Sequence, residues 1–337
     1  MLTEDFSYDL PEEAIAQQPV EPRHDARLLD TRDLSDRRFH QLPGMLEPGD
    51  LVVVNETKVR AARLHGSKIE TGGRVEALLL RRLDPERWEA LVRPARRLGP
   101  GVALRFGELE AEVLTEPVDG RVTLRIEADE ETEAVIARTG ELPLPPYITS
   151  RLEDPERYQT IFARTTGSAA APTAGLHFTD QVVAGLVGRG IELARVDLEV
   201  GIGTFRPIAV DRIEDHVMHR ESFRVPEATA EAIARTRRRG GRVVAVGTTT
   251  VRTLESAARP DGSVESGPAS TELFLRPGSE FRVVDALVTN FHLPRSSLIV
   301  MIAAFMGDGW RGAYATALSR GYRFLSLGDA MYCERSR

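Results

Sequence analysis

The sequence predicts an α/β protein whose mixed, largely parallel sheet domain carries a small antiparallel β-barrel as an insertion. In the C-terminal part of the chain, segments with helical periodicity alternate with apolar strands, as in a largely parallel sheet. Between about Val59 and Glu127, short strands instead follow one another without intervening helices, as in a small barrel. We therefore expect an α/β catalytic domain from residues 1–58 and 147–337, and an inserted barrel domain from residues 59–146.

The elements of the α/β domain can be assigned from their periodicity and from the residues that end them. An apolar strand near the N-terminus precedes the insertion, and helices that end at glycine alternate with strands after it. In chain order we expect a strand at Leu51–Val54, a helix at Asp180–Gly190, a strand at Ile191–Val200, a helix at Pro226–Arg239, a strand at Arg242–Gly247, a strand at Phe281–Val288 and an apolar helix near Ser297–Met306.

The inserted segment shows the two-residue alternation of half-buried strands, separated by turn residues such as Thr71-Gly72-Gly73 and Asp119-Gly120. A short acidic helix, Glu130–Arg138, and the stiff segment Leu142–Pro146 lead back to the α/β domain. The apolar positions that alternate are Val75, Ala77 and Leu79, then Trp88, Ala90 and Val92, and later Val122, Leu124 and Ile126.

Composition limits the function classes. No run of eighteen apolar residues predicts a membrane span, and the acidic N-terminus lacks the features of a secretion signal, so we expect a cytoplasmic protein without a membrane partner. The single cysteine, Cys333, excludes an intrachain disulfide and a cysteine-based zinc site. The net charge of −7 disfavours a large nucleic-acid footprint, although arginines cluster at 93–105 and at 235–242. Each cluster is typical of a solvated face.

Two of the loops that follow predicted strands could bind a ligand. Gly201-Ile-Gly-Thr-Phe205 would let backbone N–H groups approach a ligand, although an unliganded tight turn explains it equally well. Gly247-Thr-Thr-Thr250 leads into a helix whose N-terminus would attract a carboxylate or phosphate, with Arg252 one turn further on. Alternatively, Thr248 or Thr249 is the helix N-cap.

Histidines mark the other candidate positions. Thr289–Pro294 follows a predicted strand and contains the polar residues Asn290 and His292. His177 lies in the segment Ala171–Phe178. His216 and His219 have a spacing that could bind a metal on a helix, but Glu221 could equally orient a histidine base. The chain lacks the His-Glu-x-x-His, phosphate-loop and Gly-x-Ser-x-Gly motifs. From the residues alone we expect an α/β enzyme with histidine and hydroxyl chemistry in several loops.

Long motifs occur in these loops and elsewhere along the chain, at Tyr8–Glu13, Ile15–Gln17, Gly49–Asn55, Tyr158–Ala163, Ala170–Thr179, Gly203–Pro207, Met218–Glu221, Val246–Ser256 and Val284–Pro294. These segments resemble signature blocks of the S-adenosylmethionine:tRNA ribosyltransferase-isomerases of queuosine biosynthesis, and the likeness covers nearly the whole chain.

The resemblance implies that S-adenosylmethionine is a ribosyl-donating co-substrate and that tRNA is the acceptor, with no metal and no evident obligate protein partner. The ribosyl carbons would pass to the aminomethyl group of a 7-deazaguanine, giving epoxyqueuosine with release of adenine and methionine. By membership of these motifs, the expected catalytic residues are His177, His219, Glu221 and His292. The residues expected to hold S-adenosylmethionine are Gly201, Gly203, Thr204, Thr248, Thr249 and Arg252. The other residues expected to bind substrate are Thr173, Phe178, Phe205, Thr289 and Asn290.

Three positions depart from the family pattern, because Ser270, Arg276 and Ser279 stand where aromatic residues are usual. Aromatic faces stack on unpaired bases, so their loss raises an alternative, a paralogue that uses the same donor on a non-tRNA amine. A non-catalytic RNA-binding protein is a third hypothesis, supported only by the barrel and the arginine clusters.

Overall fold

The computed structural model describes residues 1–128, 130–201 and 207–336, and these form two compact units. Unit 1 comprises residues 1–58, 145–165 and 171–337, and unit 2 comprises residues 59–144 and 166–170. This division assigns the short segment 166–170 to the unit that holds the insertion, whereas the sequence-based boundaries placed it in the α/β domain. The two units are described separately below.

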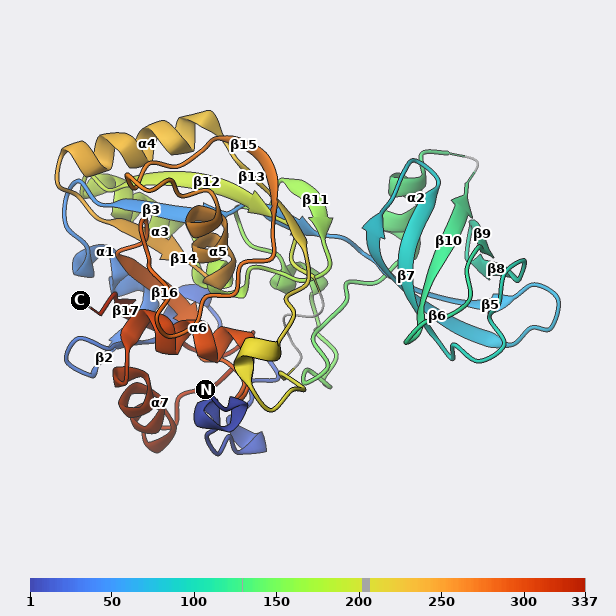
Figure 1. Cartoon of the computed structure of the whole chain (residues 1–337), viewed down its shortest axis with the longest axis horizontal. Coiled ribbons are helices and arrows are strands. Elements are labelled where there is room, and N and C mark those ends of the chain that lie inside the picture. The colour runs from blue at the N-terminus through green and yellow to red at the C-terminus, as the bar shows by residue number, and fades with distance from the viewer. Residues whose placement is uncertain (129, 202–206, 337) are drawn as a thin grey trace. The chain divides into compact units, whose positions relative to one another are not determined.

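Unit 1 is built on a nine-stranded mixed sheet with the order β15-β13-β12-β3-β14-β16-β17-β1-β2 (Figure 1). Its central strands β12, β3, β14 and β16 are parallel, whereas β13, β15, β17 and β2 each have an antiparallel neighbour. The predicted α/β class with a mixed sheet is confirmed. The strands are β1 (Arg27–Asp30), β2 (Ser35–Arg38), β3 (Leu51–Asn55), β12 (Glu192–Leu198), β13 (Glu221–Val225), β14 (Val243–Val246), β15 (Gly267–Thr271), β16 (Ala286–Asn290) and β17 (Ala330–Glu334).

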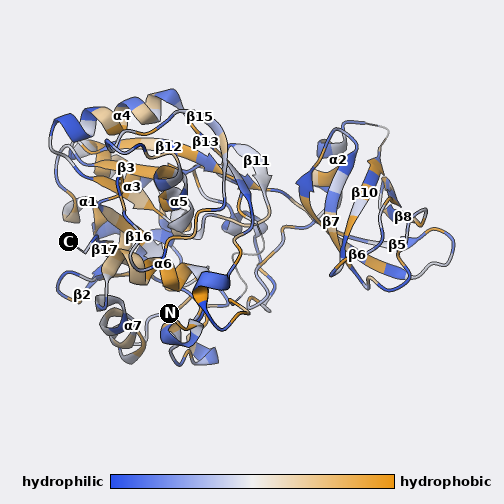
Figure 2. Ribbon diagram, viewed as in Figure 1, coloured by the Kyte–Doolittle hydropathy of each residue, from blue (hydrophilic) through white to orange (hydrophobic). Residues whose placement is uncertain are grey.

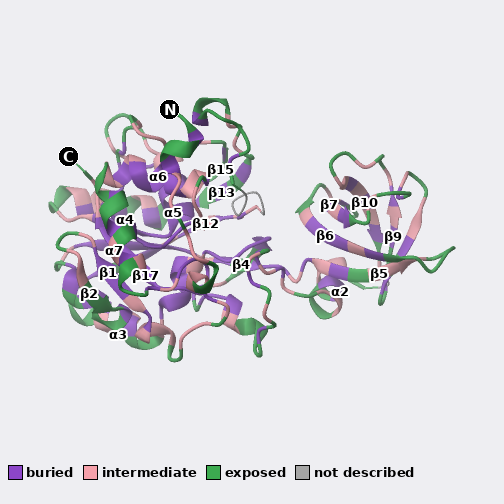
Figure 3. Cartoon of the chain, turned by 90° about the horizontal axis from the view of Figure 1, so that it is seen from below, coloured by how far each residue is buried: buried purple, intermediate pink, exposed green. Residues whose placement is uncertain are grey.

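The central strands are apolar because both of their faces are covered (Figures 2 and 3). On one face, alternate residues such as Val52 and Val54 pack in a core cluster with α1 (Leu42–Met45) and α3 (Asp180–Gly188). Helix α4 (Glu227–Arg238) contacts β12 and β3, and α5 (Thr248–Ser256) contacts β3, β12, β14 and β16. These helices pack on the sheet that positions the ends of the strands, where the loops around the pocket begin.

The last predicted strand begins later than its apolar pattern suggested. We expected a strand over Phe281–Val288, but β16 starts at Ala286. The backbone N–H groups of Arg282, Val283 and Val284 donate to the Glu255 carboxylate at 2.8–3.1 Å. Because these groups are bound to a side chain of α5, they are not available to a neighbouring strand.

The C-terminal part of unit 1 contains one helix that the sequence predicted and two elements that it did not. Helix α6 spans Ser297–Met306, as expected, and the Ser296 hydroxyl caps it by accepting from the Ile299 N–H at 3.3 Å. Helix α7 (Gly309–Ser319) and strand β17 were not predicted. Strand β17 lies between β16 and β1, and its position is determined by pairing with strands distant in sequence.

Unit 2 contains a closed six-stranded antiparallel barrel with the order β10-β7-β6-β5-β8-β9, which confirms the predicted barrel. Trp88, Leu104, Phe106 and Leu124 fill its interior. At Gly66 the strands approach so closely that a Cβ atom would lie 2.1 Å from the Arg105 carbonyl oxygen. The elements of the unit are β5 (Arg63–Lys68), β6 (Arg74–Arg82), β7 (Arg87–Arg93), β8 (Ala103–Phe106), β9 (Leu109–Val113), β10 (Arg121–Glu127) and α2 (Thr132–Thr139). Outside the barrel, β4 (Thr57–Val59) and β11 (Thr165–Ser168) form a two-stranded sheet.

Candidate active site

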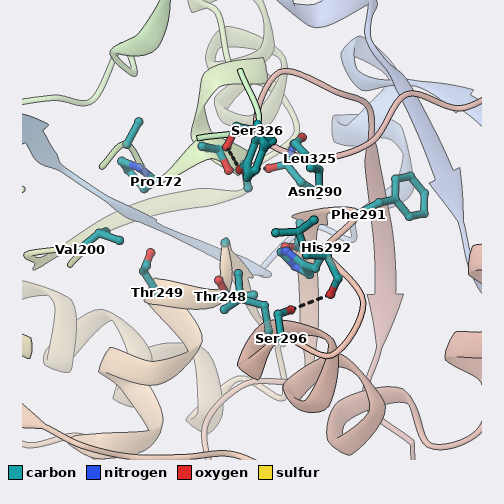
Figure 4. A pocket seen from close by; sticks show the side chains of 18 residues that line it. Pro172, Val200, Thr248, Thr249, Asn290, Phe291, His292, Ser296, Leu325 and Ser326 are labelled. Carbon is teal, nitrogen blue, oxygen red and sulfur yellow. Dashed lines mark hydrogen bonds between the residues drawn. The ribbon is translucent and has the colours of Figure 1, made fainter. Parts of the chain in front are cut away.

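A pocket opens in unit 1 where the parallel strands β12, β14 and β16 end. Ligands of α/β sheets bind at this edge because loops and helix N-termini converge there. The pocket contains about 580 Å³ of empty space, its open mouth included. In Figure 4, Val200, Thr248 and Thr249 lie apart from Asn290, Leu325 and Ser326, and His292 lies near Thr248. The lining residues are Tyr147, Ala171, Pro172, Thr173, Ala174, Val200, Gly247, Thr248, Thr249, Thr289, Asn290, Phe291, His292, Leu293, Ser296, Leu298, Leu325 and Ser326.

The N-terminus of α5 reaches the pocket. Gly247 is the residue that precedes the helix, with a left-handed φ of 85° that glycine adopts without strain. Thr248 and Thr249 are therefore the first helical residues, and the alternative in which one of them is the N-cap is wrong. The Thr249 hydroxyl accepts from the Asn55 amide at 3.3 Å. The first turn of the helix thus presents its N–H groups and positive dipole end where a ligand anion could bind.

His292 lies in the pocket wall and is held by the loop that follows β16. Its Nε2 is 3.0 Å from the Thr289 hydroxyl, and its backbone N–H donates to the Tyr314 hydroxyl at 3.0 Å. The Tyr8 hydroxyl donates to its carbonyl oxygen. Burial disfavours the charged imidazolium and lowers the pKa of His292 to about 3. The ring is therefore neutral at physiological pH.

Polar side chains on the other side of the pocket are held in place by hydrogen bonds. The Thr173 hydroxyl donates to Asn290 Oδ1 at 2.9 Å, and the Asn290 amide nitrogen donates to the Leu325 carbonyl at 3.1 Å. Tyr147 and Ser326 join their hydroxyls at 2.7 Å. Tyr147 and Ser326 were not among the predicted site residues. Their segments carry no periodic or loop motif, so only the tertiary structure reveals them.

Three further predicted residues meet outside the pocket lining. Glu221 begins β13 and forms a buried ion pair with Arg252 of α5. The second Glu221 oxygen accepts from the Gly201 N–H at 3.0 Å. Arg252 also donates to the Leu273 carbonyl at 3.2 Å, and its Nη2 has no hydrogen-bond partner among the described residues. This arrangement connects α5 and β13 to Gly201, which lies three residues after the end of β12.

The structure places the other predicted residues elsewhere. His177 lines a second, smaller cavity, stacks on Phe39, and has each ring nitrogen near a backbone carbonyl oxygen. Burial lowers its pKa. Phe178 is part of the core cluster on one face of the sheet. His219 is exposed on the segment before β13. None of these three lines the pocket at the strand ends.

Gly203, Thr204 and Phe205, which we expected to contribute to binding, lie outside the described residues. Within residues 1–128, 130–201 and 207–336, no group of three or more His, Cys, Asp or Glu side chains is placed to hold a metal ion. No helix in this described part of the chain is long and apolar enough to cross a membrane.

The fold is that of an α/β protein with a pocket at the strand ends of its mixed sheet. The family model for queuosine biosynthesis proteins matches residues 3–333, and the chain belongs to this family. Proteins from Gloeobacter violaceus and Moorella thermoacetica, both named S-adenosylmethionine:tRNA ribosyltransferase-isomerase, are 52% and 50% identical to it. These alignments cover 98% of this chain in both cases, and 95% and 99% of the respective relatives.

A solved structure gives the same assignment. The crystal structure of the S-adenosylmethionine tRNA ribosyltransferase from Thermotoga maritima is 38% identical to this chain and aligns with a TM-score of 0.55. The alignment covers 97% of this chain and 99% of the Thermotoga maritima chain. The predicted family is therefore confirmed, and the chain is an enzyme of the ribosyltransferase-isomerase class.

Proposed function

We propose that the protein transfers and isomerises the ribosyl unit of S-adenosylmethionine onto the aminomethyl group of 7-aminomethyl-7-deazaguanine in tRNA. The products would be epoxyqueuosine in the tRNA, adenine and methionine. The observation that carries this proposal is that the family's motif residues Thr173, Thr248, Thr289, Asn290 and His292 line one pocket. The names of the relatives specify the donor and the class of acceptor.

The N-terminus of α5 suits the methionine end of the donor. A carboxylate placed there would receive hydrogen bonds from N–H groups that have no partner within the helix, and it would interact favourably with the helix dipole. Thr248 and Thr249 lie at this point and add hydroxyl groups. We assign the methionine carboxylate to this turn. The glycine loop that starts at Gly201 remains a predicted second contact.

His292 is the residue that we assign to proton transfer. The sulfonium of the donor acidifies the adjacent C5′–H bond, so a base that removes this proton initiates the loss of adenine. Burial lowers the pKa of His292 and keeps the ring unprotonated, which leaves a nitrogen lone pair available but makes the ring a weaker base than a solvated histidine. The Thr289 hydroxyl beside Nε2 would fix the orientation of the ring. His177 and His219 do not line this pocket, so the assignment does not use them.

Glu221 and Arg252 would act as positioning residues. Each satisfies the charge of the other in a buried pair, and Glu221 also binds the Gly201 N–H. A carboxylate held in this way is poorly suited to act as a base, because its protonation would break the pair. We infer that the pair holds the backbone of Gly201 beside α5, the helix whose N-terminus would bind the donor.

The experiment measures products. The purified protein is incubated with S-adenosylmethionine and tRNA carrying the aminomethyl-deazaguanine, and released adenine and modified nucleoside are quantified by mass spectrometry. We expect adenine release together with a mass gain on the tRNA base. His292→Gln should abolish both, whereas the matched change of an exposed histidine outside the family motifs, His40→Gln, should leave them unchanged. Adenine release without a mass gain on the tRNA would contradict the proposed acceptor.

A non-tRNA amine acceptor has less support than tRNA. That alternative depends on Ser270, Arg276 and Ser279, and none of them lines the pocket. Instead, the Ser270 hydroxyl accepts from Arg220 at 2.8 Å, and the Ser279 hydroxyl accepts from the Arg276 N–H at 3.0 Å. The substituted positions thus make local contacts of their own.

A further inference from the structure

The two arginine clusters of the sequence differ in how their charges are satisfied. In the cluster at 235–242, Arg235 pairs with Glu192 at 2.8 Å and Arg237 pairs with Asp285 at 2.8 Å. Arg242 pairs with both Asp50 and Glu334. These arginines therefore stabilise unit 1, and most of this cluster is already occupied by carboxylates.

In unit 2, the cationic side chains divide into two groups. Arg105, although part of the cluster at 93–105, pairs with Glu110 at 2.6 Å. Arg60, Arg63, Arg81, Arg82, Arg87, Arg121, Arg125 and Arg138 also each lie within 4.0 Å of a carboxylate. Among the described residues of this unit, five lysine and arginine side chains have no carboxylate oxygen within 4.0 Å. They are Lys68, Arg74, Arg93, Arg96 and Arg97, and we call them the free cationic surface.

Strand pairing brings the members of this surface together. Arg74 begins β6 and lies opposite Ser67 of β5. Arg93 ends β7 opposite Glu76, two residues from Arg74 on β6, so Arg74 and Arg93 are diagonal neighbours on the same outward face. The Lys68 ammonium donates to the Arg97 carbonyl oxygen, which joins the end of β5 to the loop after β7.

The loop that carries Arg96 and Arg97 is anchored. Leu98 is fully buried, whereas Arg93, Arg96 and Arg97 are exposed. Arg97 has a left-handed φ of 65°, a conformation that is uncommon for a residue other than glycine. Such a conformation persists when the surrounding contacts enforce it. The cationic side chains are therefore directed outward from a backbone of defined shape.

We propose that the free cationic surface binds the phosphate backbone of RNA. Unpaired like charges held close together repel one another, and a polyanion with regularly spaced phosphates relieves this repulsion while releasing its own counterions. Arginine guanidinium groups also match phosphate oxygens in a bidentate geometry. The surface carries no aromatic side chain, so it recognises backbone rather than bases. That the RNA is tRNA rests on the proposed function.

The test compares two variants that remove equal charge. Arg93→Ala/Arg96→Ala/Arg97→Ala removes three free cations, whereas Arg81→Ala/Arg105→Ala/Arg138→Ala removes three that are ion-paired. Filter binding of unmodified tRNA is measured from 50 to 300 mM salt for the wild type and both variants. Thermal unfolding and calorimetric titration with S-adenosylmethionine show whether each variant is folded and retains its pocket.

We expect the first variant to bind tRNA at least about tenfold more weakly than the wild type. The slope of its log binding constant against log salt concentration should be smaller by about 0.9 for each phosphate that it no longer neutralises. The second variant should bind tRNA like the wild type. Equal losses of tRNA affinity in both variants, or an unchanged salt slope in the first variant, would overturn the proposal. The proposal would also fail if the first variant bound tRNA like the wild type but bound anionic phosphatidylserine vesicles more weakly than the wild type does. Because the readout is binding, a wild type that binds tRNA through this surface without releasing adenine would refute the proposed function and leave the RNA surface standing.

Discussion

The buried histidine of the pocket makes unit 1 sensitive to acid in a way that can be calculated. The pKa of His292 is about 3 in the folded protein, against 6.5 for a histidine in the unfolded chain. Between these values the unfolded chain binds a proton that the folded protein does not, so stability falls as the pH decreases below 6.5. Each pH unit in this window costs about 1.4 kcal/mol, so His292 alone lowers the free energy of unfolding by about 2 kcal/mol at pH 5.

The assay is urea unfolding at pH 7 and pH 5 for the wild type and for His292→Gln. Glutamine does not titrate and can keep a hydrogen bond to the Thr289 hydroxyl. We expect the wild type to lose about 2 kcal/mol more than the variant between the two pH values. The pKa of His177 is also lowered by burial, but His177 is present in both proteins, so its contribution cancels.

An equal loss of stability in the wild type and in His292→Gln would refute the reasoning, since it would mean that His292 is already protonated or is not buried from water. The same low pKa predicts that the activity profile of the wild type contains no step from His292 between pH 5 and pH 8.

Three further predictions concern binding and stability. Thr248→Val should raise the Kd for S-adenosylmethionine by about tenfold through loss of a hydrogen bond to a charged group, with little change in melting temperature; isothermal titration calorimetry checks this. Glu221→Gln should cost about 3–5 kcal/mol in urea unfolding because it leaves the Arg252 charge buried without a partner, and a cost equal to that of an exposed glutamate would contradict it. Gly247→Ala should lower stability by about 1–3 kcal/mol, because alanine is strained at a φ of 85°; an unchanged melting temperature would show that the turn relaxes.

Much of the pocket could be predicted from the sequence because of a property of parallel sheets. Their strands end at a common edge, so polar residues that directly follow such strands come together whatever the rest of the fold does. Thr248 and Thr249 follow β14, while Asn290 ends β16 and His292 follows it, and all four line the pocket. The spacing of apolar residues likewise predicted α6 within its observed bounds.

Other predictions depended on contacts that local patterns do not encode. His177 belongs to the same motif as Thr173, yet the short helical turn of residues 173–177 carries Thr173 to the pocket and His177 to a second cavity. Tyr147 and Ser326 meet in the pocket although their segments carry no signal of their own. The same limit explains why β17 was missed, since its neighbours β16 and β1 lie far from it in the chain.

By itself, the sequence determined the alternation of strands and helices, the barrel insertion, the family and the loops that form the pocket, because each depends on periodicity or on motifs among near neighbours. The tertiary structure alone decided which histidine lines the pocket, that Glu221 and Arg252 form a buried pair, and which arginines remain without a carboxylate partner. Burial and ion pairing depend on residues distant in sequence, and these interactions determine whether a side chain titrates, supports the fold or is free to bind.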